Sequence, residues 1–172
     1  MASPSPTSVF DDGLDPALID LSRQVGAALQ ARNERVAVAE SSAGGLISAT
    51  LLSIGGASAH YLGGAVVYTG RSRPLVLDEV PDGTRGATED FVRLLAAGAR
   101  QRMGAEWGLA ETGATGPSGN PYGDPPGHAW VGVARPDGEI VTRNVLTGTD
   151  DRIANMAAFT RAALELLLEE AS

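Results

Sequence analysis

Residues 36–45 read Val-Ala-Val-Ala-Glu-Ser-Ser-Ala-Gly-Gly, and this stretch decides the fold. The run of small and β-branched apolar residues predicts a short buried strand. The glycines after it predict a tight turn, and residues 46–52, Leu-Ile-Ser-Ala-Thr-Leu-Leu, continue as a helix. A strand, a small-residue turn and a helix make up the unit of an α/β sheet, in which ligands bind at the carboxyl ends of the strands.

The surrounding sequence predicts one α/β domain over residues 15–172, with a mixed sheet. Leucines and valines at spacings of three and four predict a first helix capped by Asp15. Thr88 is expected to cap another helix, and the Asp150-Asp151 pair to cap a last one over 150–169. Strands are expected over 62–68, 107–111, 129–134 and 140–146, with a short helix within 71–80, a hairpin turn at 136–138 and a loop from Thr112 to Gly127.

Composition excludes several classes of protein. The 172 residues carry a net charge of −8, which argues against broad binding to nucleic acid or to anionic membranes. Cysteine is absent and all 13 basic residues are arginine, so disulfides, cysteine nucleophiles, Schiff-base lysines and Ser–Lys dyads are excluded within the chain. With two histidines, a multi-histidine metal site is not expected.

The N-terminus predicts a short leader. Residues 1–14 are rich in serine and proline and are expected to be disordered. They have neither the basic start nor the apolar core of a secretory signal, and no apolar run reaches the ~20 residues of a membrane span. We therefore expect a cytoplasmic protein.

The turn at residues 40–45 is the first candidate site. Backbone N–H groups at the start of a helix can hold an anion or an oxyanion, and the hydroxyls of Ser41 and Ser42 could add hydrogen bonds or a nucleophile. The alternative interpretation is structural: either serine simply caps the helix.

Two further segments are candidates. Tyr68, at the end of a strand and followed by Thr69 and Arg73, offers a phenol and a guanidinium for phosphate or carboxylate; alternatively, the tyrosine is half-buried at a sheet edge. The glycine-rich loop after Glu111 allows the backbone to approach a ligand closely, or is a surface connection. His128 is a possible base, although a lone histidine is more often a structural hydrogen-bonding residue.

Taken in order, these segments resemble the CinA C-terminal domain family, whose best-known members are nicotinamide-nucleotide amidohydrolases, also called NMN deamidases. The resemblance extends from about Leu18 to Leu167. Four family motifs carry it: A-E-S-C-T-G-G at residues 39–45, G-A-S-x-x-F/Y at 56–61, Y-S-N-x-x-K at 68–73 and G-x-A-G-P-x-G at 113–119.

The resemblance implies a three-layer α/β/α fold and hydrolysis of the nicotinamide carboxamide to the acid with release of ammonia, with no metal or organic cofactor. It implies Ser41 as the nucleophile, Tyr68 as a partner in proton transfer and Arg73 as the third catalytic position. The glycine-rich loop would wrap the nucleotide, and a homo-oligomer is expected. The substrate-binding residues implied in this way are Glu40, Ser42, Gly44, Gly45, Thr69, Thr115, Gly116, Pro117, His128 and Arg152.

The sequence departs from the family pattern at three places. Arg73 stands where the family has lysine, and a guanidinium does not accept a proton at ordinary pH. The family's E-K-P-V-G is matched by residues 124–128, Asp-Pro-Pro-Gly-His, where the cation is lost and His128 is a candidate to replace it. In the late G-D-R-x-x-x-R motif, Arg152 stands in for one arginine. Two hypotheses follow: an amidohydrolase acting on nicotinamide mononucleotide or a related amide, or a catalytically silent nucleotide-binding module.

Overall fold

The computed structural model describes residues 13–172, and its centre is a five-stranded mixed sheet in the order β2-β1-β3-β4-β5. Strands β2, β1 and β3 are parallel, whereas β3, β4 and β5 form an antiparallel meander. The strands are β1 (Val36–Glu40), β2 (Tyr61–Val66), β3 (Trp107–Ala114), β4 (His128–Ala134) and β5 (Ile140–Leu146).

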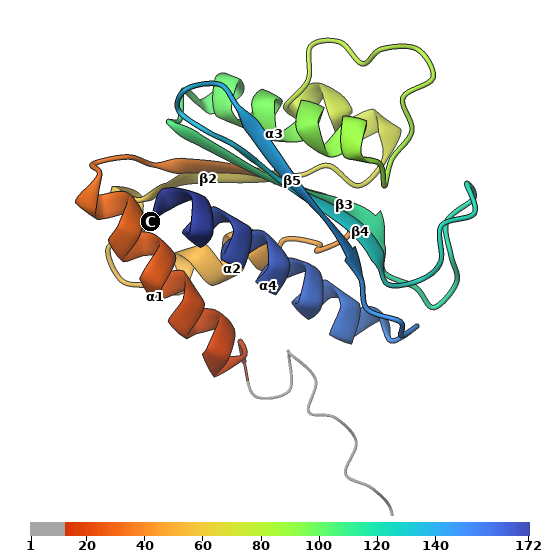
Figure 1. Cartoon of the computed structure of the whole chain (residues 1–172), viewed down its shortest axis with the longest axis horizontal. Coiled ribbons are helices and arrows are strands. Elements are labelled where there is room, and N and C mark those ends of the chain that lie inside the picture. The colour runs from red at the N-terminus through yellow and green to blue at the C-terminus, as the bar shows by residue number, and fades with distance from the viewer. Residues whose placement is uncertain (1–12) are drawn as a thin grey trace, which may run out of the picture.

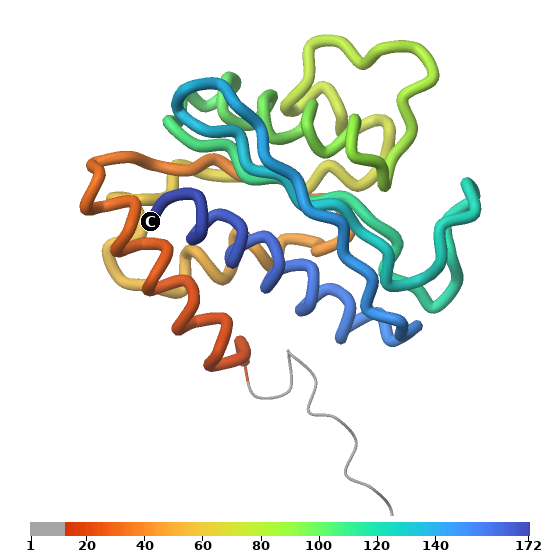
Figure 2. Tube along the Cα trace, in the orientation of Figure 1, coloured from red at the N-terminus to blue at the C-terminus, as the bar shows by residue number. Residues whose placement is uncertain are grey.

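Helices cover both faces of the sheet, so the fold has three layers (Figure 1). Helices α1, α2 and α4 pack on one face and α3 packs on the other, as the chain trace also shows (Figure 2). The helices are α1 (Pro16–Ala31), α2 (Leu46–Leu52), α3 (Glu89–Met103) and α4 (Arg152–Ala171), with 3₁₀ turns η1 (Ala57–Ala59) and η2 (Gly70–Leu75). The predicted α/β/α architecture with a mixed sheet is confirmed.

Two apolar cores separate the layers because side chains of successive strand residues point to opposite faces. Leu109 on β3 joins the core under α1, α2 and α4, together with Val36 and Val38 of β1. Ala110, the next residue, joins the core under α3. Glu111 therefore points to the same face as Leu109, toward the layer of α1, α2 and α4.

The predicted helix starts are accurate where a side-chain cap exists. The Asp15 carboxylate accepts the Ala17 amide at the start of α1, and Thr88 accepts the Phe91 amide at the start of α3. At α4 the cap is Asp151, whose carboxylate accepts two amides. Of the two aspartates predicted to cap this helix, Asp151 is confirmed and Asp150 is not.

Two predicted strand ends are wrong. Strand β3 continues to Ala114, which pairs with His128, so the loop begins at residue 115 and not at Thr112. Strand β2 ends at Val66, before Tyr68, and the short helix predicted within 71–80 is the 3₁₀ turn η2 with Pro74 inside it. The leader predicted over residues 1–14 lies, except for its last two residues, outside the described part of the chain.

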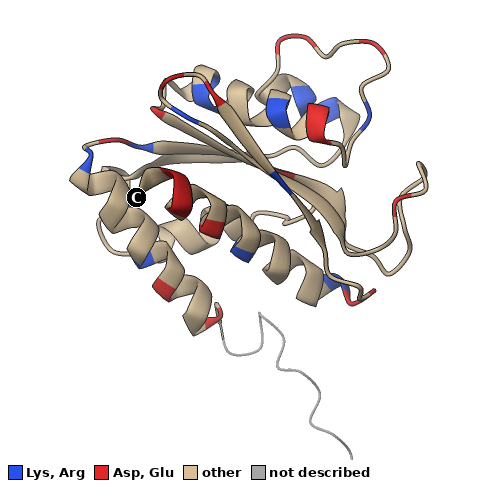
Figure 3. Ribbon diagram, viewed as in Figure 1, with Lys and Arg blue, Asp and Glu red and all other residues tan. Residues whose placement is uncertain are grey.

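Basic and acidic residues are interspersed along the outer helices and loops (Figure 3). Between residues 13 and 172, no helix is both long and apolar enough to cross a membrane. The same residues contain no cluster of three histidines, aspartates or glutamates that could hold a metal ion.

Candidate functional site

Two adjoining cavities lie at the carboxyl ends of β1 and β3. The first, here called the Ser41 cavity, has a volume of ≈ 320 Å³, is bordered by Ser41 and Thr112, and opens on the α3 side of the sheet. The second, the Ser42 cavity, has ≈ 240 Å³ and opens on the α4 side. Both are bordered by Tyr68, Gly113, Asn120 and Pro121. The two cavities therefore form two halves of one site, one bordered by Ser41 and the other by Ser42.

This edge of the sheet is where the sequence places the three motifs, and the structure brings most of the predicted residues to it. Ser41, Tyr68, Thr69 and Arg73 border the Ser41 cavity. Ser42, Tyr68, Thr115, Gly116 and Arg152 border the Ser42 cavity. A hollow of ≈ 570 Å³ beside α3, bordered by Val76, Asp78 and Arg102, contains none of these residues.

Glu40 does not border either cavity. Its carboxylate is completely buried under the first turn of α2 and accepts the amides of Gly45, Ile47 and Ser48 at 3.0 Å each. The Ser48 hydroxyl donates to it at 2.6 Å. Glu40 therefore fixes the turn from below, and this position is not that of a substrate ligand.

Glu111 fixes the same turn from the β3 side. One carboxylate oxygen accepts the amides of Ser41, at 3.0 Å, and Ala43, at 2.8 Å. The Ser42 hydroxyl donates a hydrogen bond to the other oxygen. The side chain is fully buried.

Burial raises the pKa of Glu111 from 4.5 to about 7. The hydrogen bonds from Ser42, Ala43 and Ser41 act in the opposite direction, since they favour the ionised carboxylate, and the charge of Glu40 adds to the rise. A carboxyl group with a pKa near neutrality can accept or give up a proton at physiological pH.

These contacts correct both predictions for the turn. The N-cap of α2 is Gly45 without a side-chain cap, so neither serine caps the helix. Five amides of the turn and of the first turn of α2, those of Ser41, Ala43, Gly45, Ile47 and Ser48, are already bound to the carboxylates of Glu40 and Glu111. These five amides are therefore not available to an oxyanion.

The two glycines of the turn are conformational requirements. Gly44 and Gly45 have φ of 68° and 98°, a region that residues with a side chain rarely adopt. A Cβ at Gly44 would also lie 2.9 Å from the Met156 methyl carbon of α4. The structure thus places these residues beneath the site as part of its scaffold.

Arg152, the first residue of α4, contacts both the glycine-rich loop and Tyr68. Its guanidinium donates to the Gly116 carbonyl at 2.6 Å and lies 3.4 Å from the Tyr68 hydroxyl. The loop is further held by Asn155, whose amide donates to the Thr115 carbonyl at 2.8 Å. Pro117 follows Gly116 through a cis peptide bond.

Arg73 borders the Ser41 cavity with its guanidinium 4.6 Å from the centre of the Phe91 ring. The ring of Tyr122 also borders this cavity, and its centre lies 5.2 Å from the Arg85 guanidinium. The cavity is thus bordered by one guanidinium, that of Arg73, and by the rings of Phe91 and Tyr122, which suits a ligand with both a planar ring and negative charge.

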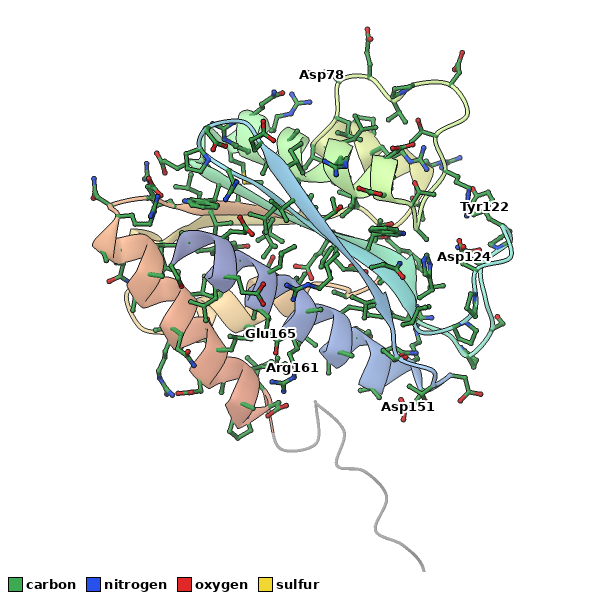
Figure 4. The ribbon with its side chains drawn as sticks, viewed as in Figure 1. Asp78, Tyr122, Asp124, Asp151, Arg161 and Glu165 are labelled. Carbon is green, nitrogen blue, oxygen red and sulfur yellow. The ribbon has the colours of Figure 1, made fainter. Side chains whose placement is uncertain are left out.

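The loop over residues 115–127 is tied to the segment before α3. Arg85 donates to the Asp124 carboxylate at 2.6 Å, and Asn120 donates to the same oxygen at 2.7 Å. The hydrogen bond from Arg85 is the main reason that the pKa of Asp124 is lowered. Figure 4 shows Tyr122 and Asp124 together on this loop at the rim of the molecule.

His128 is not brought to either cavity. Its Nε2 lies 3.0 Å from the Asn144 side-chain nitrogen and its Nδ1 lies 3.9 Å from the Asp124 carboxylate. His60 is buried, with its Nδ1 3.1 Å from the Gln30 side-chain nitrogen. Within residues 13–172, neither histidine can therefore act on a ligand held beside Ser41 or Ser42.

Glu111 is a residue of this site that the sequence motifs do not identify. The available signal is a carboxylate directly after the buried run Trp-Gly-Leu-Ala at residues 107–110, because a charge at the end of a buried strand needs a partner.

Known proteins share the sequence pattern and the fold of this chain. The family model described as the CinA C-terminal domain matches residues 18–171. A CinA-like protein of Anaeromyxobacter dehalogenans (strain 2CP-C) is 39% identical over 163 residues, which cover 92% of this chain and 38% of the relative. A CinA-like protein of Salinibacter ruber is 35% identical over 158 residues, which cover 90% and 38%. The chain thus spans well under half the length of these relatives.

Solved structures give the same result. A CinA superfamily protein from Klebsiella pneumoniae 700603 has a TM-score of 0.84 at 29% identity, covering 90% of this chain and 97% of that one. The competence/damage inducible protein CihA from Agrobacterium tumefaciens has a TM-score of 0.84 at 27% identity, covering 92% and 98%. With the family model and these relatives in agreement, the chain belongs to the CinA C-terminal domain family.

Proposed function

We propose that the chain is an amidohydrolase that converts the carboxamide of nicotinamide mononucleotide, or of a related amide, into the acid and ammonia. The observation that carries the proposal is the convergence of Ser41, Ser42, Tyr68 and Arg152 on the two adjoining cavities. Amide hydrolysis through an ester intermediate needs a nucleophilic hydroxyl, a proton acceptor and a positive group for the oxyanion.

The turn supplies two hydroxyls. The family resemblance favours Ser41, which borders the larger of the two cavities, while Ser42 borders the other. Tyr68 borders both, so its phenol is within the site as a proton-transfer partner whichever serine reacts.

Guanidinium groups replace backbone amides as the stabilisers of negative charge. Arg152 lies at the Ser42 cavity and Arg73 at the Ser41 cavity, and each can hold either a developing oxyanion or a substrate phosphate. The rings of Phe91 and Tyr122 offer surfaces for a pyridine ring. Local positive charge of this kind suits an anionic mononucleotide although the whole chain carries a net charge of −8.

The partner proposed is thus a small molecule, neither nucleic acid nor membrane. A homo-oligomer and a cytoplasmic location remain predictions from the sequence.

The direct test measures ammonia release from nicotinamide mononucleotide by the wild type and by a Ser41→Ala/Ser42→Ala double variant. The proposal expects stoichiometric formation of the acid and ammonia by the wild type and a loss of at least about 10³-fold in the double variant, since it removes both hydroxyls. An untouched substrate at high enzyme concentration would contradict it.

A second candidate is a silent nucleotide-binding module, and the arginine at position 73 favours it because the family's lysine is missing there. This candidate predicts that nicotinamide mononucleotide raises the melting temperature without being hydrolysed, since a ligand that binds the native state alone stabilises it. Parallel thermal-shift and ammonia assays separate the two candidates.

A further inference from the structure

We propose that Glu111 is the general base of this site and that the hydroxyl it activates is that of Ser42. The inference rests on the proposed amidohydrolase function for its substrate, although the reactivity of the Ser42–Glu111 pair can be tested without that substrate.

The two carboxylate oxygens of Glu111 have different hydrogen-bond partners. One oxygen accepts the Ser41 and Ala43 amides and is held in place by them. The other is left to face the Ser42 hydroxyl, which donates to it. A base that is fixed by two backbone bonds and already bound to the proton it must remove satisfies the geometric requirement for general-base catalysis.

The surroundings favour Ser42 over Ser41. Ser42 borders a cavity together with Tyr68 and Arg152, so a carbonyl bound there would have a nucleophile, a phenol and a guanidinium around it. Within residues 13–172, the Ser41 hydroxyl has no hydrogen-bond acceptor; its backbone amide serves Glu111 instead. The family motif has cysteine where this chain has Ser42, so the pair is a feature of this sequence rather than of the motif.

Other bases are remote. The chain has no lysine, and both histidines lie outside the two cavities. The arginines that border the cavities, Arg73 and Arg152, do not accept protons at ordinary pH. Among the described residues, Glu111 is thus the acid–base group in contact with a hydroxyl of the site.

The charges around Glu111 support this role. Glu40, at the end of β1, is the like charge that acts on it, and burial is the larger cause of its raised pKa of about 7. Its β4 neighbour Val131 is apolar. The buried residues of α2 and α4 on this face carry no charge: Leu46, Ile47, Thr50 and Leu51, then Asn155, Phe159, Thr160, Ala163, Leu164, Leu166, Leu167 and Ala171.

The steps balance with water as the only co-reactant. As the Ser42 oxygen bonds to the carboxamide carbon, its proton passes to Glu111 and the carbonyl π pair moves onto oxygen beside Arg152. Collapse of this intermediate breaks the C–N bond, and the proton on Glu111 leaves with the nitrogen as ammonia. Water then attacks the Ser42 ester and gives a proton to Glu111, and the departing Ser42 oxygen takes that proton back.

The experiment uses a small dialkyl phosphofluoridate, which bonds covalently to activated serine hydroxyls. Wild type, Glu111→Gln and Ser42→Ala are incubated with it at pH 6, 7 and 8, and the modified residue is located by peptide mass spectrometry. Glu111→Gln is a close isostere whose amide oxygen can still accept the two backbone amides. Glu139→Gln, on the exposed turn of the hairpin, is the matched control.

We expect label on Ser42 in the wild type and in Glu139→Gln, about tenfold faster at pH 8 than at pH 6, as for titration of one group with a pKa of about 7. Glu111→Gln should lose at least about 10²-fold in rate together with the pH dependence. Label on Ser41, no label on the wild type, or an unchanged rate in Glu111→Gln would overturn the inference.

The outcome is separable from that of the proposed function. Label on Ser42 without hydrolysis of nicotinamide mononucleotide would support the Ser42–Glu111 pair and exclude that nucleotide as the substrate. Hydrolysis of that substrate with label on Ser41 would establish the function and refute the pair.

Discussion

The Ser42 hydroxyl donates a hydrogen bond to the carboxylate of Glu111, a residue 69 positions further along the chain. The bond links the turn after β1 to the end of β3, and both partners are buried at the edge of the sheet where the predicted site residues gather. It places a carboxyl group with a raised pKa next to a serine hydroxyl in a chain without lysine.

The first prediction concerns stability against pH. Because the pKa of Glu111 is raised by folding from 4.5 to about 7, the folded state binds this proton more tightly than the unfolded state does. Its contribution to stability is full below pH 4.5 and is lost as pH rises through 7, by about 3 kcal/mol in total. Carboxyls whose pKa is lowered, such as Asp124, titrate below this window.

The free energy of unfolding by urea, measured from pH 5 to 8, checks this. The wild type should lose stability across the range, and Glu111→Gln should remove most of that slope. Equal slopes in the two proteins would show that Glu111 does not titrate as described.

A second prediction concerns the buried carboxylate of Glu40. Replacing it by alanine leaves three backbone amides at the start of α2 without their acceptor. We expect Glu40→Ala to lower the free energy of unfolding by about 3 kcal/mol or more. Urea denaturation provides the measurement, with Glu139→Ala as an exposed control; a loss below about 1 kcal/mol would contradict the assigned contacts.

The third prediction concerns the ion pair between Arg85 and Asp124, which joins the segment before α3 to the loop over residues 115–127. Because the Arg85 side chain is 39% exposed, a double-mutant cycle should give a coupling of no more than about 1 kcal/mol. The larger effect should be local: Arg85→Ala should speed proteolytic cleavage within residues 115–127. The exposed pair of Arg102 and Asp78 is the control, and Arg102→Ala should leave the cleavage rate unchanged.

The fourth prediction distinguishes two roles of Arg73. It either binds the substrate, or it occupies the position of a catalytic lysine without being able to accept a proton. If Arg73 binds the anionic part of the substrate over Phe91, Arg73→Lys should raise KM several-fold with little change in kcat. Steady-state kinetics on nicotinamide mononucleotide measure both. A large rise in kcat would instead mean that lysine is the missing base and that Glu111 is not the base.

The sequence could predict the elements of this fold because its local signals agree. The run at 36–40, the Pro-Asp-Gly turn at 136–138 and the capping residues Asp15 and Thr88 each specify structure within a few residues. The gathering of Ser41, Tyr68 and the glycine-rich loop at one edge follows from the rule for parallel strands.

The acid–base pair could not be predicted in the same way because it depends on register. Ala39 of β1 lies opposite Ala110 of β3, and this alignment sets the residues that follow, Glu40 and Glu111, side by side beneath the turn. No local pattern encodes that alignment. The same register explains why the amides of Ser41 and Ala43 are not available to an oxyanion, because both already donate to the Glu111 carboxylate of β3.

The most direct test of the account is the pH dependence of ammonia release from nicotinamide mononucleotide by the wild type and by Glu111→Gln, with folding of both checked by circular dichroism. If Glu111 is the base, wild-type activity should rise about tenfold from pH 6 to 8, with a midpoint near the Glu111 pKa of about 7, and a folded Glu111→Gln should have at least about 10²-fold lower activity. A folded Glu111→Gln that releases ammonia at the wild-type rate, with the same pH profile, would contradict it.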